Sequence, residues 1–553
     1  MAPPPAARAI LARLELGAVL LLVVAALVPR LFDASAPLDR GFDGEQGAFF
    51  TIGAINFERL GLRRTGGYPV LNVDLGDRAD SATRLWDRPQ SWLSYANHPP
   101  SVALMAWASL NALAPADWNA AWREGHGPQG FELALRLPFL VLHVAALLSL
   151  WWAVREGHGA RAGLLALALS TGLPVLVLYA GLANYENACL AFVLLGLGFY
   201  ARWLRGGRRR DLAALALAFA AGGAVTWAPL FFAAALAAHA LFSSRRARAL
   251  AAAAVGTLCA ALPLGLHTLW ASAVLRRLGQ PPAAPLERAR ELLAPLLDGS
   301  APLSTWVGLQ LGRLAQWCTW PMLVVAAAGL GVAVIRGRRR VADPERVQIA
   351  LPLMLGGWLY LASFYQHTLD PQTPFLMMLA PGLAALGAVA LDAAAPGLAR
   401  LRAGLAPLVV LVSSLALIGI ASTGALRHGL RAPAGDTRGG RAAPQLALPG
   451  ETAAAVAQLL PRGALGLHPR ALGLNLAVSL YAWRSLWPIA GPVDPSVDAV
   501  AARVGLEAAP RWLLVPDPPP LAVSGDLAAL RTALVDVRPP DAVACGWSGW
   551  RLP

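Results

Sequence analysis

Residues 211–242 read DLAALALAFAAGGAVTWAPLFFAAALAAHALF, and this stretch decides the class of fold. A helix needs about 20 apolar residues to cross the hydrocarbon core of a bilayer, so the stretch is too long for a single crossing. It is broken near 226–229, and arginine clusters lie on both sides, at 208–210 and 245–248. The sequence therefore predicts a hairpin of two membrane-spanning helices.

The overall composition agrees with a membrane protein. Hydrophobic residues make up 57% of the 553 residues and charged residues only 14%, whereas a soluble domain carries about 25% charge. Backbone groups in lipid must be satisfied internally, so the long apolar runs form either helices or a closed barrel. Runs rich in Ala, Leu and Val without period-2 alternation exclude the barrel. We therefore expect an all-α polytopic membrane protein.

The net charge of +14 follows the membrane topology. The sequence contains no Lys, and many Arg residues form short clusters between apolar runs, at 202–210, 245–248 and 336–340. Cytoplasmic loops carry such an excess of positive charge, whereas a nucleic-acid-binding face would interleave aromatic residues with a solvated basic stripe. We therefore place these clusters in the cytosol and expect no nucleic-acid partner.

The apolar runs and the charge clusters predict about eleven spans, with the N-terminus in the cytosol and the C-terminus outside. The expected spans are 10–32, 133–153, 161–181, 185–203, 211–226, 228–242, 250–272, 314–335, 347–365, 373–392 and 404–424. The first is expected to be a retained anchor. If the 202–210 cluster is cytoplasmic, counting the crossings back along the chain places residues 33 and 131 both outside. The apolar run at 99–114 lies between them and cannot be a full crossing, so we expect an interfacial helix at the outer surface there.

Most of the non-membrane mass is expected outside the cytosol. The outer segments are 33–131, 273–313 and the tail after 424, so we predict a membrane domain over 1–424 and a small α/β domain over 425–553. In the tail, the pattern predicts strands at 464–467, 512–515 and 534–537 and helices at 451–460 and 474–483. The Lys-free, Ala/Arg/Pro-rich composition is typical of a high-GC bacterium, so the outer side is expected to be the periplasm and the membrane the bacterial inner membrane.

Four polar clusters are predicted at the outer ends of the spans, where ionisable groups are candidates for function. They read FDGEQGAFF at 42–50, YANHPP at 95–100, NYEN at 184–187 and YQHTLD at 365–370. Each has a structural explanation when taken alone, because acids cap helix N-termini, Pro starts helices, and His and Asp are common in solvated turns. Their order and spacing make the functional argument.

This order resembles the family 39 glycosyltransferases, which include the protein O-mannosyltransferases and the aminoarabinose transferases. The resemblance rests on a first span, an acidic motif, an interfacial helix and Asn97-His98-Pro99-Pro100, and it covers about residues 10–400. The stretch AINFERLG at 54–61 is similar to the family's helix end, and ALRLP at 134–138 is similar to its entry to the next span. The resemblance implies the C-type membrane glycosyltransferase fold.

It also implies inverting transfer of a sugar from a polyprenyl-phosphate donor to an acceptor on the outer side. Asp43 would be the general base that deprotonates the acceptor hydroxyl, with Glu45 the next candidate, because Gly44 separates two acids that are adjacent in many relatives. The residues expected to bind the donor phosphate or the substrate are His98, Asn97, Glu186, Tyr185, His367, Asp370 and Arg136. A divalent metal, Mg or Mn, is possible at Asp43, Glu45 or Glu186.

Two other readings stay open from the sequence. A transporter or flippase would place ionisable residues near the bilayer midplane, often in an internal inverted repeat; we see no convincing repeat. A non-catalytic relative that binds a lipid-linked sugar would keep the fold without turnover. The sequence leaves the sugar open, and the acceptor can be a protein, a lipid or a glycan.

Overall fold

The structure is a computed structural model. It describes residues 5–32, 34–35, 38, 41–72, 94–116, 118, 130–282, 285–338, 348–369, 373–401, 456, 458–459, and five strands between 465 and 552. By its internal contacts the chain divides into two units, treated separately below. Unit 1 comprises Met1–Asp33, Phe139–His267 and Ala284–Leu430, and unit 2 comprises Ala34–Pro138, Thr268–Ala283 and Arg431–Pro553. The predicted division at 424 falls outside the described residues and stays a prediction.

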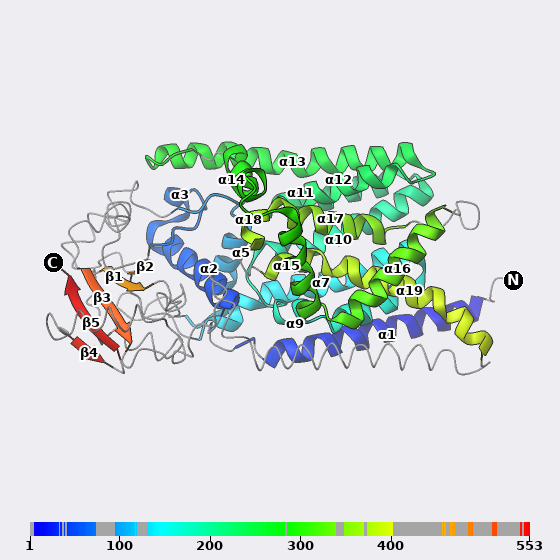
Figure 1. The fold of residues 1–553 in the computed structure, drawn as a ribbon, viewed down its shortest axis with the longest axis horizontal. Helices are drawn as coiled ribbons and strands as arrows, with labels where there is room; N and C mark the ends of the chain where they lie inside the picture. The colour runs from blue at the N-terminus through cyan, green and yellow to red at the C-terminus, as the bar shows by residue number, and fades with distance from the viewer. Residues whose placement is uncertain are drawn as a thin grey trace. The chain divides into compact units, whose positions relative to one another are not determined.

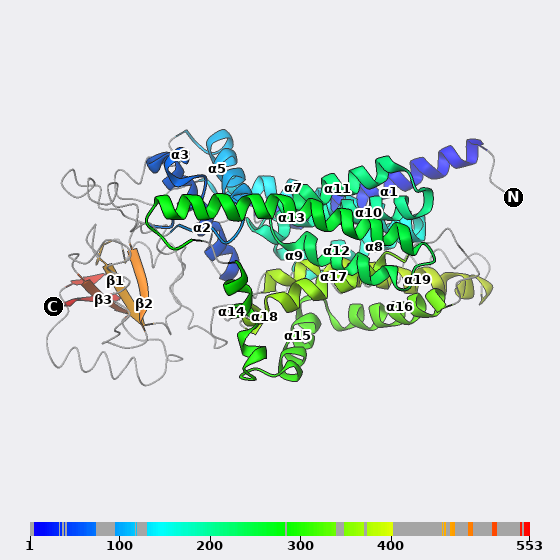
Figure 2. The same cartoon turned by 90° about the horizontal axis from the view of Figure 1, so that it is seen from above.

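Unit 1 is built from helices (Figures 1 and 2). They are α1 (Pro5–Phe32), α7 (Glu132–His158), α8 (Ala160–Thr171), α9 (Pro174–Leu178), α10 (Tyr185–Gly206), α11 (Arg209–Gly223), α12 (Ala228–Ala240), α13 (Arg246–Arg277), α14 (Pro285–Leu297), α15 (Leu303–Trp317), α16 (Trp320–Arg338), α17 (Ala350–Ser363), α18 (Tyr365–Leu369), the 3₁₀ helix η2 (Thr373–Met378) and α19 (Ala380–Leu401). The first turns of α7 and the last turns of α13 belong to unit 2. Among the described elements, α19 packs against α8, α16 and α17, and α10 packs against α11.

Apolar side chains on the outside of unit 1 mark a lipid-facing surface. On α13, Leu258, Leu262 and Leu266 recur at helical spacing and are all at least 60% exposed, an arrangement that would be unfavourable in water. Within the described residues, three helices are long and apolar enough to cross a membrane, or four if α15 and α16 count as one. Five shorter apolar helices accompany them, and the total of about eleven spans stays a prediction.

The helices agree with most of the predicted spans and correct two of them. The hairpin at 211–242 divides into α11 and α12 at the predicted place. The expected span at 161–181 is instead broken between α8 and α9, because the chain leaves the helix at Gly172 and Pro174 starts a new one. The expected span at 314–335 is also wrong as one helix: α15 and α16 meet at an angle of 113°, and Thr319 between them has a left-handed φ of 66°.

One end of unit 1, which we call the arginine-rich end, is joined by ion pairs. Arg155 Nε lies 2.7 Å from Glu15 Oε1, Arg161 Nε lies 2.7 Å from Asp392 Oδ1, and Arg202 Nε lies 3.3 Å from Asp211 Oδ1. Arg205 also pairs with Glu156. These contacts connect α1, α7, α8, α10, α11 and α19, and two of their arginines, Arg202 and Arg205, belong to a cluster that predicted the cytoplasmic side.

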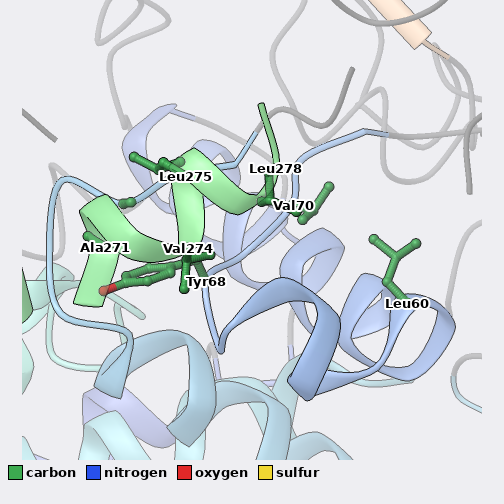
Figure 3. Packing of buried hydrophobic residues seen from close by; sticks show 8 residues of the cluster. Leu60, Tyr68, Val70, Ala271, Val274, Leu275 and Leu278 are labelled. Carbon is green, nitrogen blue, oxygen red and sulfur yellow. The ribbon is translucent and has the colours of Figure 1, made fainter. Parts of the chain in front are cut away.

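In unit 2, the helix α2 (Gly41–Leu60) packs against α3 (Leu62–Thr65) and α5 (Ser101–Leu113), and its last residue, Leu60, shares an apolar cluster with the last turns of α13. Tyr68, Val70 and Val274 lie in one apolar cluster that Figure 3 shows in close view. Trp270 Nε1 donates to the carbonyl of Gly66 at 3.0 Å. The run predicted as an interfacial helix at 99–114 is α5, whose 13 residues are too short for a perpendicular crossing.

The described C-terminal residues of unit 2 form a five-stranded sheet in the order β2-β1-β3-β5-β4. The strands are β1 (Leu465–Pro469), β2 (Ser485–Ile489), β3 (Arg511–Pro516), β4 (Ala542–Ala544) and β5 (Trp547–Leu552). The pairs that β1 makes with β2 and with β3 are parallel, and β5 is antiparallel to both β3 and β4. The strands predicted at 464–467 and 512–515 overlap β1 and β3, whereas the predictions at 534–537, at 474–483 and for most of 451–460 lie outside the described residues.

Candidate functional site

The acidic motif lies inside helix α2, which begins at Gly41 rather than after the motif. Asp43 and Glu45 therefore occupy helical positions two residues apart. Successive helical residues turn by about 100°, so the two Cα atoms lie on nearly opposite sides of the helix axis.

The second motif contacts the first within unit 2. The ring of Tyr95 meets the ring of Phe49 edge-on, with 4.9 Å between centroids. His98 stacks on the other side of this pair, with its ring 6.1 Å from that of Tyr95. His98 is half-buried and Asn97 is exposed. The structure therefore places the 42–50 and 95–100 motifs side by side.

The family-like motifs at 54–61 and 134–138 have structural roles. Asn56 Nδ2 donates to the carbonyls of Val70 and Asn72, at 2.7 and 2.9 Å, and so fixes the chain that leads away from α3. Glu58 Oε1 accepts hydrogen bonds from the side chains of Trp107 and Asn111 on α5. Both contacts tie α2 to its neighbours and hold the acidic motif in place.

Arg136 is buried near the start of α7, and its Nη1 donates to the carbonyl of Ala34 at 3.2 Å. This contact links α7 to the chain just before α2. Arg136 as a ligand of the donor phosphate stays a prediction.

In unit 1, Glu186 is buried in the first turn of α10 and accepts a hydrogen bond from Tyr360. The Tyr360 hydroxyl lies 2.6 Å from Glu186 Oε1, and Tyr360 itself is fully buried. Asn184 caps α10 by accepting from the Asn187 backbone N–H at 2.8 Å. Tyr185 is buried beside them. Glu186 is thus held by a neutral donor within the helix packing.

Two further polar groups brace the same end of α10. The Asn187 amide donates to the carbonyls of Ala180 and Leu182, at 2.7 and 3.2 Å, and its Oδ1 lies 3.2 Å from His143 Nδ1. Arg30, at the end of α1, is buried and donates to the carbonyls of Ala26 and Leu176. Within the part of the chain that the structure describes, no carboxylate pairs with Arg30.

The fourth motif contains α18, where His367 is half-buried. Arg288 Nη2 on α14 lies 3.1 Å from His367 Nε2. A guanidinium can only donate, so His367 Nε2 is the acceptor and the ring is neutral in this arrangement. Asp370 lies outside the described residues.

A row of rings joins the third and fourth motifs. Phe364 lies between Tyr360 and His367, with centroid distances of 5.0 and 6.4 Å, and it stacks on Phe375 at 5.0 Å. Tyr360, which donates to Glu186, and His367, which contacts Arg288, are therefore connected through Phe364. The four motifs form two pairs, one in each unit.

Thr368, next to His367, is held by three side chains of α15. Trp306 Nε1 donates to Thr368 Oγ1 at 2.8 Å, Gln310 Nε2 donates to the Thr368 carbonyl at 2.7 Å, and Arg313 donates to the same carbonyl. Thr368 is fully buried. We call this set the α15 clamp.

Sequence reasoning missed Arg288, Tyr360 and the α15 clamp. Trp306, Gln310 and Arg313 recur at helical spacing, a signal that would have placed them on one face of one helix. No local pattern marks Tyr360, which lies in an apolar run. Among the described residues, no group of three or more His, Cys, Asp or Glu side chains fits a metal ion.

No protein-family model and no curated protein sequence matches the chain, but solved structures do. The archaeal oligosaccharyltransferase AglB from Archaeoglobus fulgidus, in complex with an inhibitory peptide and a dolichol-phosphate, matches with a TM-score of 0.57 at 13% identity, over 91% of this chain and 69% of its own. ArnT from Cupriavidus metallidurans, bound to undecaprenyl phosphate, matches with a TM-score of 0.55 at 13% identity, over 97% and 98% of the two chains.

The oligosaccharyltransferase in complex with Zn and sulfate is similar to the same degree, with a TM-score of 0.54 at 14% identity over 90% of this chain and 68% of its own. These neighbours have the C-type membrane glycosyltransferase fold. The predicted class of membrane fold is therefore confirmed, whereas the number of spans and the periplasmic α/β domain stay predictions.

Proposed function

We propose that this protein transfers a sugar from a polyprenyl-phosphate donor to an acceptor on the periplasmic side of a bacterial inner membrane. The observation that carries the proposal is a fold shared over 97% of the chain with a protein solved bound to undecaprenyl phosphate.

The reaction is a single displacement with inversion at the anomeric carbon. The acceptor hydroxyl forms a bond to that carbon while the bond to the donor phosphate breaks, and the polyprenyl phosphate leaves as an anion. Asp43 accepts the hydroxyl proton, a role that contributes about 10²- to 10⁴-fold to the rate. Glu45 is the second candidate for the same role.

The developing charge on the phosphate needs cationic or hydrogen-bonding groups. His367 and Arg288 lie side by side, and Arg288 is half-exposed with a nearby carboxylate, Glu291, 2.8 Å away. A phosphate oxygen that replaces the Arg288–His367 contact accepts from the guanidinium and from a protonated imidazole together. His98 and Asn97 are the candidates in unit 2, and Asp370, Tyr185 and Arg136 rank below them.

The experiment on the base uses the full chain in lipid nanodiscs with a panel of undecaprenyl-phosphate sugars and protein, lipid and glycan fractions of a bacterial envelope. Asp43→Asn is expected to bind donor as the wild type does and to lose transfer, whereas Glu45→Gln retains it. Full activity of both variants rules out a base in this motif. If the wild type binds the donor but transfers sugar to none of the envelope fractions, the protein is a non-catalytic relative.

The phosphate role is tested by donor affinity. Arg288→Gln removes a charge-assisted hydrogen bond and is expected to weaken donor binding roughly tenfold to a hundredfold. The matched control is Glu291→Gln, which breaks the ion pair but keeps the guanidinium, and it is expected to leave affinity unchanged or raise it. Equal losses in both variants would show that the α14 surface matters only for folding.

A role for Mg or Mn at Asp43, Glu45 or Glu186 stays a prediction. It is checked by dialysing the protein against a chelator and restoring each ion in turn while transfer is measured.

A further inference from the structure

Helix α15 exposes no charged side chain. Its single charged residue, Arg313, is buried, and so is the amide of Gln310. Both belong to the α15 clamp and face α18. The exposed residues of α15 carry no charge: they are Leu303, Ser304, Thr305, Gly308, Leu309, Leu311, Gly312 and Gln316.

The neighbouring helix α14 shows the ordinary pattern. It is of similar length and exposes four charged side chains, Glu287, Arg288, Arg290 and Glu291. Both helices follow α13 in unit 1 and both contact α18. Their exposed surfaces therefore suit different surroundings: α14 suits water, and α15 suits a medium in which charge is unfavourable.

The bend between α15 and α16 indicates how deep the end of α15 lies in the membrane. α15 turns by 113° relative to α16, and Figure 2 shows it running across the direction of α16. Trp320, at the bend, is 66% exposed, and exposed Trp residues concentrate where the hydrocarbon core meets the headgroups. The other end of α16 carries Arg336 and Arg338, so the bend lies at the opposite surface from this basic end.

We propose that α15 lies in the leaflet opposite the arginine-rich end, with its uncharged face in the lipid and its clamp residues turned toward α18. The occupant of the exposed face is the bilayer itself. Leu303 and Leu311 are 55% and 48% exposed, and they enter the acyl region while Trp320 stays at headgroup depth. Because the α15 clamp binds Thr368, the contact of α15 with lipid also helps to fix the position of Thr368, the residue next to His367.

The test measures the depth of single labels in the full chain, reconstituted in phosphatidylcholine vesicles. Cys259 and Cys545 are replaced by Ser, and the buried Cys189 and Cys318 stay in place. A fluorophore is attached at Leu309→Cys, with Leu311→Cys as a second position if the first variant fails to fold. The controls are Leu258→Cys on the lipid face of α13 and Glu287→Cys on α14.

Quenching is compared for lipids that carry a nitroxide at acyl carbon 5 or 12 and for iodide in the buffer. At position 309 we expect the shallow nitroxide to quench at least twofold more than the deep one, with little effect of iodide. Position 258 should reverse the nitroxide order, and position 287 should respond to iodide. Iodide quenching at 309 equal to that at 287 overturns the proposal. A label at 309 or 311 that responds to neither quencher overturns it as well, because protein then covers the face.

Discussion

The two ends of unit 1 handle ionisable groups in opposite ways. At the arginine-rich end, Arg155, Arg161 and Arg202 each face a carboxylate within 3.3 Å. At the other end, Glu186 is held by a tyrosine hydroxyl and Arg30 by backbone carbonyls. The ion pairs of the first end thus join different helices, whereas Glu186 and Arg30 at the second end are held by neutral dipoles.

This difference predicts unequal contributions to stability. Partly exposed ion pairs contribute about 0–1 kcal/mol each. A buried polar group is costly to leave without its hydrogen-bond partner. We therefore expect the loss of a neutral partner at the second end to cost more than the loss of an ion pair at the first.

The largest expected effect comes from Tyr360→Phe, which leaves Glu186 buried without its donor. Leaving a buried group without its hydrogen-bond partner costs about 1–3 kcal/mol, so we expect a loss of this size in the free energy of unfolding, measured by thermal denaturation in detergent. Glu186→Leu in the same background removes the unpaired carboxyl group and should recover part of the loss. If Tyr360→Phe and the wild type have the same stability, the neutral hydrogen bond at this end contributes no more than the ion pairs at the other.

Thr368→Val should have the next largest effect, because it removes the acceptor of Trp306 Nε1 in a fully buried place. A neutral hydrogen bond contributes about 0.5–1.5 kcal/mol, and unfolding should become easier by about that amount. Thr368→Ser keeps the hydroxyl and serves as the control. If Ser and Val behave alike, the hydroxyl does not hold α15 to α18.

At the arginine-rich end, Arg161→Gln should cost less. The Arg161 side chain is 52% exposed, so the pair with Asp392 is expected to contribute below about 1 kcal/mol. Its contribution should shrink further between 0.1 and 1 M NaCl, since the screening length falls from about 10 to 3 Å. A loss as large as that of Tyr360→Phe, insensitive to salt, would contradict the assignment of this end as a partly exposed anchor.

The smallest expected effect is a gain, from Gly308→Ala on the exposed face of α15. A Cβ at this position meets nothing within 4 Å, and Ala is a better helix former than Gly by up to about 1 kcal/mol. We expect a gain of about 0.5 kcal/mol in thermal stability. Gly329→Ala is the contrasting control, because its Cβ would run into the Leu386 backbone where α16 packs on α19. Destabilisation by both variants would mean that α15 is covered.

Regular features of the fold could be predicted from the sequence because they depend on composition and period. The hairpin α11–α12 followed from the length of one apolar run and the arginines at its ends. The break at 172–174 carried its own signal, a Gly followed closely by Pro, which the span at 161–181 overlooked. The bend at Thr319 carried the same kind of signal, because Pro321 lies at the start of α16, but the left-handed conformation of Thr319 itself could not be predicted, since it is rare for Thr.

The site was predictable in part for the same reason. Motifs predicted His367 and Glu186, but their partners Arg288 and Tyr360 come from other helices, and no single-sequence pattern reports a contact between residues 79 or 174 positions apart. The pairing of the 42–50 motif with the 95–100 motif depends on the meeting of Phe49 and Tyr95. That contact is a property of packing rather than of spacing.

The backbone partners of Arg30 set an order for biosynthesis. One of them, Ala26, belongs to α1, but the other, Leu176, is synthesised 146 residues later. An arginine within a span resists release into lipid, and its long side chain can reach the headgroups while it waits. Arg30 of α1 thus gains its second backbone partner only after α9 has been synthesised. A nascent chain cut before residue 176 should leave α1 beside the insertion machinery, where crosslinking can detect it.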